Sequence, residues 1–254
     1  MFETLDIEKD GPIGRMTLNS PEKLNPLSRQ RLIDLIEAAR WFDKQPEIKV
    51  VIVKGAGRAF SAGADLSGFG DSSDISPRDG ADLGRRMADA LEEMKAISIA
   101  AIQGWCVGGA LVLAAACDLR IATSTARFSI PEVDLGIPLA WGGIPRLVRE
   151  IGPALTKELV ITCRPFDAAE AKSAGFLNRI VEPDQLGAEA EALAEQVAKR
   201  PTNPVQVTKR HVNGVTAQMV GTMRAWSDAD GLLASFTDPE CVVARQAYLA
   251  KQGK

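Results

Sequence analysis

Two short stretches of small residues could bring backbone N–H groups close to a ligand oxygen. The first, Ser61-Ala62-Gly63-Ala64, has no bulky side chain that would keep a ligand from the backbone. The second, Gly104-Trp105-Cys106-Val107-Gly108-Gly109, ends in paired glycines at a predicted helix start, where N–H groups lack helical partners. Two donors from different loops that converge on one oxygen form an oxyanion hole. Either stretch alone could equally be a tight turn or a close helix–strand contact.

Two other kinds of site fit the first stretch poorly. A dinucleotide-binding G-x-G-x-x-G motif starting at Gly55 needs a small residue where Phe60 stands. A serine nucleophile directly follows its strand, whereas Ser61 lies eight residues beyond Val53. The only histidine, His211, lies in a polar helical stretch. We therefore expect neither a dinucleotide site nor a serine hydrolase.

Buried strands are predicted directly before both stretches. The apolar runs Val50–Val53 and Ile99–Ile102 are typical of strands buried on both faces, and Leu119–Ala122 resembles them. Helices are predicted between them, at Asp82–Met94 and Gly109–Ala116. This alternation predicts parallel strands joined by helical crossovers, an α/β fold. Loops at the carboxyl ends of parallel strands meet at one edge of the sheet, so the two stretches are expected close together.

The flanking sequence predicts smaller elements. An N-terminal β-hairpin is expected from Phe2–Lys9 and Ile13–Leu18, and a helix capped by Ser28 follows. Residues Ser67–Gly80, rich in Gly, Ser and Asp, are expected to be mobile. Short helices are predicted at Gly142–Arg149, Ala154–Thr162 and Ala168–Ala174, a strand at Asn178–Val181, and a longer helix at Asp184–Lys199. We expect an α/β core domain over residues 1–200 and a helical C-terminal subdomain over residues 201–254.

Composition excludes several classes of function. With 254 residues, 46% of them hydrophobic, the chain can bury a core without disulfides or metal. Its net charge of −3 gives no basic field for nucleic acid or anionic lipid. The four cysteines form no C-x-x-C pair, so we expect neither metal nor redox chemistry. The start lacks signal-peptide features and no apolar stretch is long enough to span a membrane, so a soluble, cytoplasmic protein is expected.

Several motifs in order resemble the crotonase (enoyl-CoA hydratase/isomerase) family. The family carries A-G-A-D, G-x-x-x-G-G some forty residues later, then C-D, F-x-x-P-E, L-G and G-G-x-x-R-L. The order and spacing match over essentially the whole chain. The corresponding residues here are Ala62–Asp65, Gly104–Gly109, Cys117-Asp118, Phe128–Glu132, Leu135-Gly136 and Gly142–Leu147.

This resemblance implies a fold of repeated ββα units, an acyl-CoA thioester substrate and a homotrimer or homohexamer. The C-terminal helices would serve oligomerisation and the acyl-CoA pocket. No separate cofactor is expected, because coenzyme A is part of the substrate. The thioester oxygen would be held by the N–H groups of Ala64 and Gly109. Coenzyme A would contact Ala62, Ala64, Asp65 and Leu66, and Lys23 could meet its phosphates or simply be solvated.

The sequence departs from the hydratases at one of their two glutamates. Glu132 matches the proton-exchanging glutamate, but the glutamate three residues after the oxyanion glycine is Val112 here. The resemblance therefore favours an isomerase-type reaction with Glu132 as single base. A hydratase, another thioester hydrolase or lyase, and a non-catalytic acyl-CoA-binding protein remain as alternatives. Asp134 could supply a missing acid or tie down its loop, and Trp141 could line an apolar acyl pocket or belong to the core. Ala140 stands where dienoyl isomerases have an acid.

Overall fold

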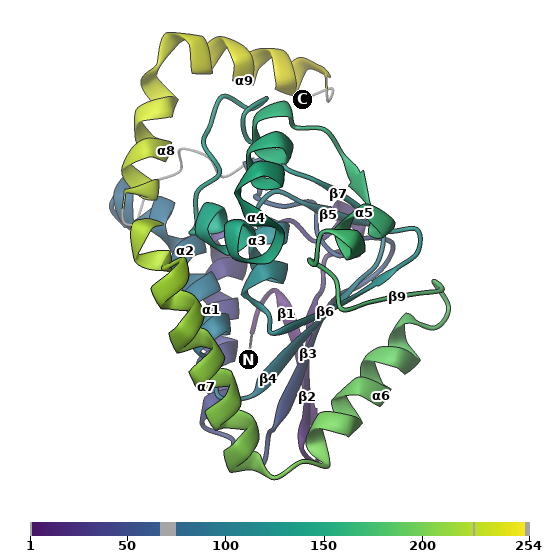
Figure 1. Ribbon diagram of the computed structural model, residues 1–254. Helices are drawn as coiled ribbons and strands as arrows, with labels where there is room; N and C mark the ends of the chain where they lie inside the picture. Colours follow the sequence, from purple (N-terminus) through teal and green to yellow (C-terminus); the bar gives the residue numbers. More distant parts are fainter. Residues whose placement is uncertain (1, 67–74, 226, 252–254) are drawn as a thin grey trace.

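Strand β3 (Val50–Gly55) shows why the central strands are apolar at nearly every position. Its residues Val51 and Val53 pack in the main hydrophobic core, while Val50 and Ile52 pack in a second core on the opposite face. The expectation of a strand buried on both faces is therefore confirmed. The computed structural model describes residues 2–66, 75–225 and 227–251 (Figure 1).

A six-stranded sheet forms the centre of the molecule. Strand β1 pairs antiparallel with β2, which confirms the predicted hairpin, and the other neighbours pair in parallel. The strand order is β1 (Leu5–Asp10), β2 (Ile13–Leu18), β3, β4 (Ile97–Ile102), β6 (Leu119–Thr123) and β9 (Arg179–Val181).

A second, smaller sheet is formed by short strands that follow strands or helices of the main layer along the chain. It consists of β5 (Trp105–Val107), β7 (Arg127–Ser129) and β8 (Phe166–Asp167). The chain passes from β4 to β5 and then into helix α3 (Gly109–Ala116), and from β6 to β7 before helix α4 (Gly143–Thr162). These turns are the predicted ββα units.

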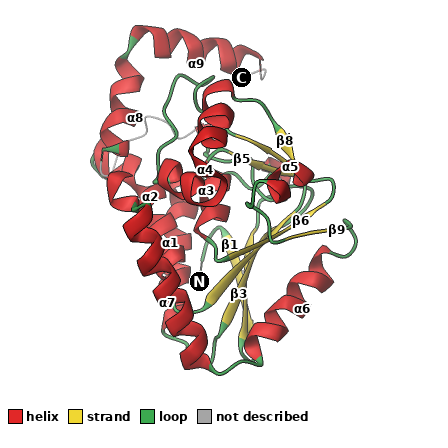
Figure 2. Cartoon of the chain, viewed as in Figure 1, coloured by secondary structure: helices red, strands yellow, loops and turns green. Residues whose placement is uncertain are grey.

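Helices cover both faces of the large sheet (Figure 2). Helices α1 (Arg29–Asp43) and α2 (Pro77–Glu93) contribute to the main core. Helix α6 (Leu186–Ala198) packs on the other face. Helix α1 is capped as predicted, because the Ser28 hydroxyl accepts a hydrogen bond from the Arg31 N–H.

One prediction about helices needs correction, and another is confirmed. Helix α2 begins at Pro77 rather than Asp82, since Ser76 caps it and Pro is well suited to the first turn. Residues 67–74 of the segment expected to be mobile lie outside the described residues, and Pro77–Gly80 are helical. The two helices predicted after Gly142 are the two parts of α4, which are separated by a kink at the non-helical Gly152, whose φ is 76°.

The C-terminal part of the described chain is helical. Helices α7 (Thr202–Met219), α8 (Asp228–Thr237) and α9 (Pro239–Lys251) follow one another, and α8 packs against α2 and α9. The Lys209 ammonium ties α7 to the core by donating to Asp118 Oδ2 (2.7 Å) and to the Ala96 carbonyl (3.0 Å). The domain boundary at residue 200 stays a prediction. The remaining elements are η1 (Pro21–Lys23), α5 (Ala168–Ser173) and η3 (Thr222–Ala225).

Two expected absences can be compared with the described part of the chain. Within residues 2–66, 75–225 and 227–251, no helix combines the length and apolar character that crossing a bilayer requires. In the same ranges, no cluster of three His, Cys, Asp or Glu side chains could ligate a metal ion. All four cysteines are free thiols, and Cys106, Cys117 and Cys163 are buried.

Candidate active site

Two strands of the small sheet, β5 and β7, and the loop segment around Ser61 run parallel and end side by side. Residue Cys106 of β5 is paired with Phe128 of β7 on one side and forms a bridge with Ser61 on the other. The three segments therefore run in register. Residues a few positions beyond these partners leave the same edge of the sheet, where α/β proteins place their sites.

The candidate residues lie just beyond this edge. Ala64 lies three residues after Ser61, and Gly109 lies three residues after Cys106. Glu132 lies four residues after Phe128. All three line one cavity of about 280 Å³. The structure thus brings together the residues that the sequence predicted as the oxyanion hole and the base.

The N–H of Ala64 is turned away from its neighbouring segment. Leu27 donates to the Gly63 carbonyl (2.7 Å) and accepts from the Asp65 N–H (3.2 Å), forming a parallel bridge around Ala64. In extended chain, successive N–H groups point to opposite sides. The Ala64 N–H therefore points away from Leu27, and it has no hydrogen-bond partner within the described residues.

The N–H of Gly109 is the second donor without a partner among the described residues. Gly109 is the first residue of α3, so its N–H is one of those that a helix leaves unpaired. The two loops touch, because a Cβ added to Gly63 would lie 2.4 Å from the Val107 carbonyl oxygen and 3.6 Å from the Gly109 nitrogen. Two N–H groups without partners among the described residues therefore belong to touching loops that line one cavity, as an oxyanion hole requires.

Glu132 is a buried carboxyl group, only 9% exposed. Its Oε2 has no hydrogen-bond partner among the described residues. Burial raises the pKa of Glu132 to about 7, because the charged form loses water. The carboxyl lies against Gly108, where an added Cβ would be 2.3 Å from Oε1. Gly108 also has a φ of 51°, so only glycine suits this position.

Apolar side chains form the rest of the inner cavity. Val112, one turn beyond Gly109 on α3, is 1% exposed and lines the cavity together with Ala140 and Trp141. Trp141 thus lines this cavity, and its role in an acyl pocket stays a prediction.

The sequence analysis expected the C-terminal helices at the acyl-CoA pocket, but it named none of the residues that α8 supplies to this cavity, which are Leu232, Leu233 and Phe236 of the same chain. The signal for them was the apolar pattern of residues 232–236, whose partner could not be deduced without the tertiary structure.

Comparisons with known proteins agree with this site. The family model described as enoyl-CoA hydratase/isomerase matches residues 8–252. The chain belongs to the enoyl-CoA hydratase/isomerase family. A short-chain-enoyl-CoA hydratase of Clostridium acetobutylicum is 35% identical over 248 residues, covering 97% of this chain and 94% of the relative. A crotonyl-CoA hydratase of Syntrophomonas wolfei is 32% identical over 239 residues, covering 93% and 92%.

The fold is the crotonase fold, as predicted. The crystal structure of an enoyl-CoA hydratase/isomerase from Pseudoalteromonas atlantica superposes with a TM-score of 0.88. The two chains are 27% identical, and the match covers 98% of each.

Some residues that the family resemblance suggested do not line the cavity. Asp134 is exposed and is not among the residues that line the cavity, and its assignment to the substrate pocket stays a prediction. Of the predicted coenzyme A contacts, Ala64 and Asp65 line the cavity, but Ala62, Leu66 and the exposed Lys23 do not. Contacts of these three with coenzyme A stay predictions.

The serine hydrolase alternative is excluded by the surroundings of Ser61. Its side chain is fully buried, and its hydroxyl donates to the Asn25 carbonyl (2.7 Å). His211 is exposed on α7, on a different element. Ser61 therefore shapes the loop before Ala64 and has no base beside it.

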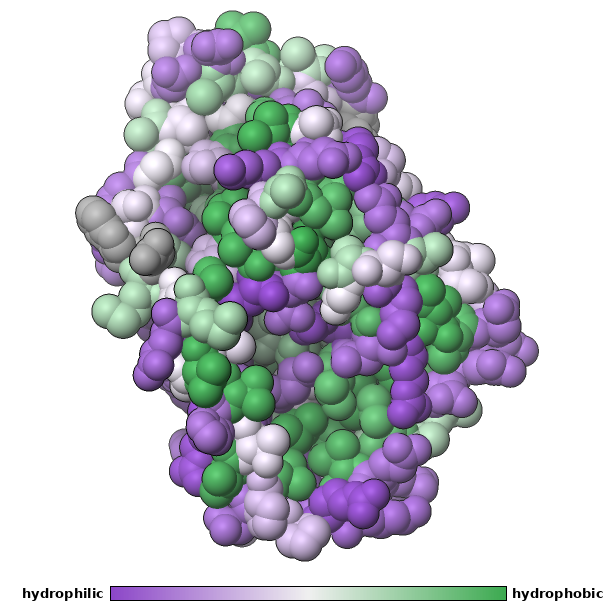
Figure 3. All heavy atoms as spheres, in the orientation of Figure 1, coloured by the Kyte–Doolittle hydropathy of each residue, from purple (hydrophilic) through white to green (hydrophobic). Residues whose placement is uncertain are grey.

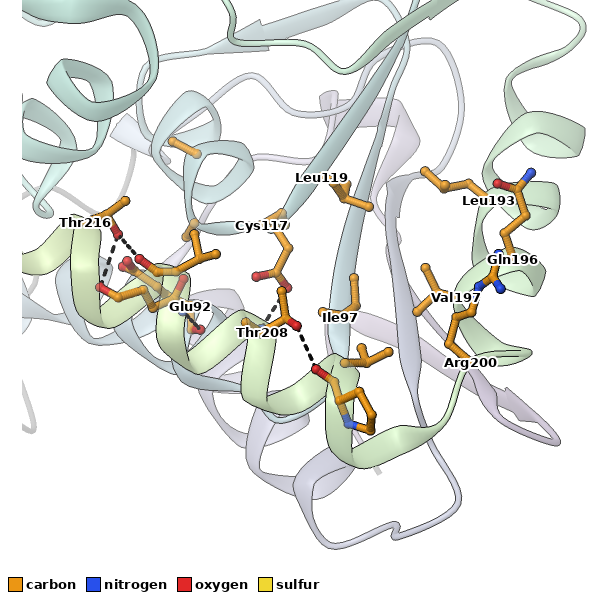
Figure 4. A pocket seen from close by; sticks show the side chains of 18 of the residues that line it. Glu92, Ile97, Cys117, Leu119, Leu193, Gln196, Val197, Arg200, Thr208 and Thr216 are labelled. Atoms are coloured by element: carbon orange, nitrogen blue, oxygen red, sulfur yellow. Dashed lines mark hydrogen bonds and ion pairs between the residues drawn. The ribbon is translucent and has the colours of Figure 1, made fainter.

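A larger cavity of about 690 Å³ lies between α6 and α7. Hydrophobic residues gather in this hollow (Figure 3). Figure 4 shows Thr208 and Thr216 of α7 on one side and Leu193 of α6 on the other. Its acidic lining residues Glu92, Asp118 and Glu150 accept bonds from basic side chains. The residues predicted for chemistry line the smaller cavity, which we therefore take as the candidate active site.

Proposed function

We propose that this chain acts on an acyl-CoA thioester and stabilises its enolate in the oxyanion hole of Ala64 and Gly109. An enolate of a thioester carries its new negative charge on the carbonyl oxygen. The two residues line the cavity and their N–H groups have no partner among the described residues, so these donors would bind that oxygen more strongly as it becomes charged. The apolar lining suits an acyl chain.

The reaction that this site supports best is isomerisation of a 3-enoyl-CoA to the 2-enoyl-CoA. Glu132 would remove a proton from C2, and the electron pair would move into the thioester to form a dienolate. The same carboxyl would return the proton to C4, leaving the double bond between C2 and C3. Atoms and charge balance without a further reactant.

One observation carries this proposal: Glu132 is a buried carboxyl whose pKa is near 7, in a cavity otherwise apolar at its inner end. The other charged residues that line the described cavity, Arg29 and Asp65, are partly exposed. A group with a pKa close to the working pH can both accept and donate a proton. An isomerase with a single base needs that property.

Hydration is the second candidate, because the relatives from Clostridium and Syntrophomonas are named hydratases. Hydration needs a water to be held for attack. Val112 occupies the position of the family's first glutamate and offers no hydrogen bond, and Asp134 is exposed. We therefore expect hydration of a 2-enoyl-CoA to be slower than isomerisation by at least roughly 10²-fold, the size of one acid–base contribution.

The test supplies both substrates to the purified protein and follows the products by chromatography. Fast isomerisation with slow hydration supports the proposal, and fast hydration without isomerisation contradicts it. Val112→Glu should raise hydration, since it adds the missing acid, whereas the control Val112→Leu should not. Another thioester hydrolase or lyase activity would appear as free coenzyme A or a cleaved acyl group.

We also propose that the protein is a homotrimer or homohexamer. Several apolar side chains on and beside α7 are exposed in the single chain, among them Val212 (54%), Met219 (76%) and Met223 (88%). Exposed apolar groups close together mark interaction surfaces. Light scattering that finds a monomer at micromolar concentration would contradict this assignment.

A further inference from the structure

The loop that carries Trp141 is fixed in an unusual conformation. Trp141 has a φ of 62°, in the left-handed region that bulky residues rarely adopt. The loop is held on both sides, because the Gly142 N–H donates to Asp228 Oδ2 (2.8 Å) and Arg146 donates to the Trp141 carbonyl (3.4 Å). Strained residues that persist in a well-held loop are often functional.

The indole of Trp141 lies against two glycines. A Cβ added to Gly84 in the middle of α2 would lie 1.8 Å from Cδ2 and 2.1 Å from Cε2 of the ring. A Cβ added to Gly109 would lie 2.2 Å from Cζ3. The ring therefore fills the space between the backbone of α2 and the oxyanion glycine. No other residue type at position 84 would leave room for it.

The same indole lines the candidate active site. The cavity measures about 280 Å³, at the lower end of the range for small-molecule sites. Beside Trp141, its inner lining is formed by Val112, Leu139 and Ala140, all buried and apolar. The volume that the ring occupies is thus withheld from any ligand that enters the cavity.

We propose that Trp141, placed by Gly84, sets the size of the acyl group that the site accepts and restricts it to short, compact, apolar acyl chains. This inference rests on the proposed function, since it takes the cavity to be the acyl pocket of a coenzyme A thioester. Gly84 is a positioning residue that acts through Trp141. Neither residue is needed for the proton transfer itself.

The first experiment measures binding of saturated acyl-CoAs from butanoyl to decanoyl by calorimetry. Trp141→Ala should raise the affinity for octanoyl-CoA relative to butanoyl-CoA by at least about tenfold, because each methylene placed in an apolar pocket is worth about tenfold or more. Trp141→Phe should shift the same ratio less. The control Ile161→Ala removes an apolar side chain that is 65% exposed on α4, and it should leave the ratio unchanged.

The second experiment changes Gly84, which lies against the indole of Trp141. Gly84→Ala should push the indole into the cavity and lower the affinity for hexanoyl-CoA relative to butanoyl-CoA by about tenfold. In the double variant with Trp141→Ala, the new methyl group has space. The double variant should therefore show the chain-length profile of Trp141→Ala alone. Its Tm should not fall below that of Trp141→Ala.

Each outcome decides something separate. If Trp141→Ala weakens all acyl-CoAs by the same factor, Trp141 only supports the loop and the inference is wrong. The inference also fails if the effects of Gly84→Ala persist unchanged in the double variant. Binding needs no turnover, so a protein that binds the series but does not isomerise refutes only the proposed reaction. A wild-type protein that binds none of these thioesters refutes the proposed substrate class as well.

Discussion

Two glutamates, the buried Glu132 in the smaller cavity and the half-buried Glu92 in the larger one, are affected by their surroundings in opposite ways. Burial alone would raise the pKa of Glu92, but Arg146 and Arg149 bond to it (2.6 Å each), and its pKa is lowered below the ordinary value. Among the described residues, Glu132 has no basic neighbour to offset burial, and its pKa rises to about 7. The comparison teaches that partners, more than burial, decide whether a carboxylate becomes part of the scaffold or a base.

The largest expected difference between the two glutamates is in activity. Glu132→Gln should lower the isomerisation rate by about 10²- to 10⁴-fold, because an amide cannot accept and return the proton. Glu92→Gln should change the rate by less than about threefold at temperatures where the variant stays folded. Initial rates with a 3-enoyl-CoA check this. Equal losses of rate in both variants would contradict the claim that only Glu132 acts as the base. Full activity of Glu132→Gln would point to a different base.

Glu92→Gln should show the larger loss of stability. It leaves Arg149 without its carboxylate partner and Arg146 with Asp89 alone (2.8 Å), and breaking a buried pair typically costs about 3 kcal/mol. Because the folded-state pKa of Glu92 is lowered, its contribution is present above the ordinary value of 4.5 and is lost as the pH falls. Urea unfolding should therefore show a gap between wild type and variant that is constant above about pH 5.5 and shrinks as the pH falls below 4.5.

Glu132→Gln should do the reverse and stabilise the protein. The folded-state pKa of Glu132 is raised from 4.5 to about 7, so the stability it provides is complete below pH 4.5 and is lost as the pH rises through 7. Removing the titration should leave Glu132→Gln more stable than wild type by about 2–3 kcal/mol at pH 8. At pH 4, the titration of Glu132 should contribute no difference in unfolding free energy between wild type and Glu132→Gln in the same urea measurements. A variant less stable than wild type at pH 8 would show that Glu132 has a partner when ionised.

The pH profile of the wild type gives the smallest effect. If ionised Glu132 is the base, kcat/KM should fall about tenfold for each pH unit below its pKa of about 7 and level off above it. Wild-type protein assayed from pH 5.5 to 9 is sufficient. A profile that is flat down to pH 5 would mean that the base has an ordinary carboxyl pKa.

Much of the site could be predicted because strand register translates sequence spacing directly into spatial position. Ala64, Gly109 and Glu132 each lie at a short, fixed distance beyond neighbouring residues of the small sheet. The role of Gly84 could not be predicted in this way. Its partner Trp141 is far away in the sequence, and only the packing of α2 against the loop brings them together.

Asp134 lies outside the cavity lining for a local reason. The segment after Pro131 forms a turn with helix-like hydrogen bonds, from the Leu135 N–H to the Pro131 carbonyl and from the Gly136 N–H to the Val133 carbonyl. In such a turn, residues two positions apart point to different sides. Glu132 therefore faces the cavity while Asp134 faces solvent.

The central claim is that one carboxyl group, Glu132, carries the proton from C2 to C4. The most direct test is a single turnover of 3-enoyl-CoA deuterated at C2, with mass spectrometry of the 2-enoyl-CoA product. Because the Glu132 carboxyl is buried and its Oε2 has no hydrogen-bond partner among the described residues, we predict that a measurable share of the deuterium appears at C4. Complete loss of the label to solvent in that turnover, or a hydrated product in place of the isomer, would contradict the claim.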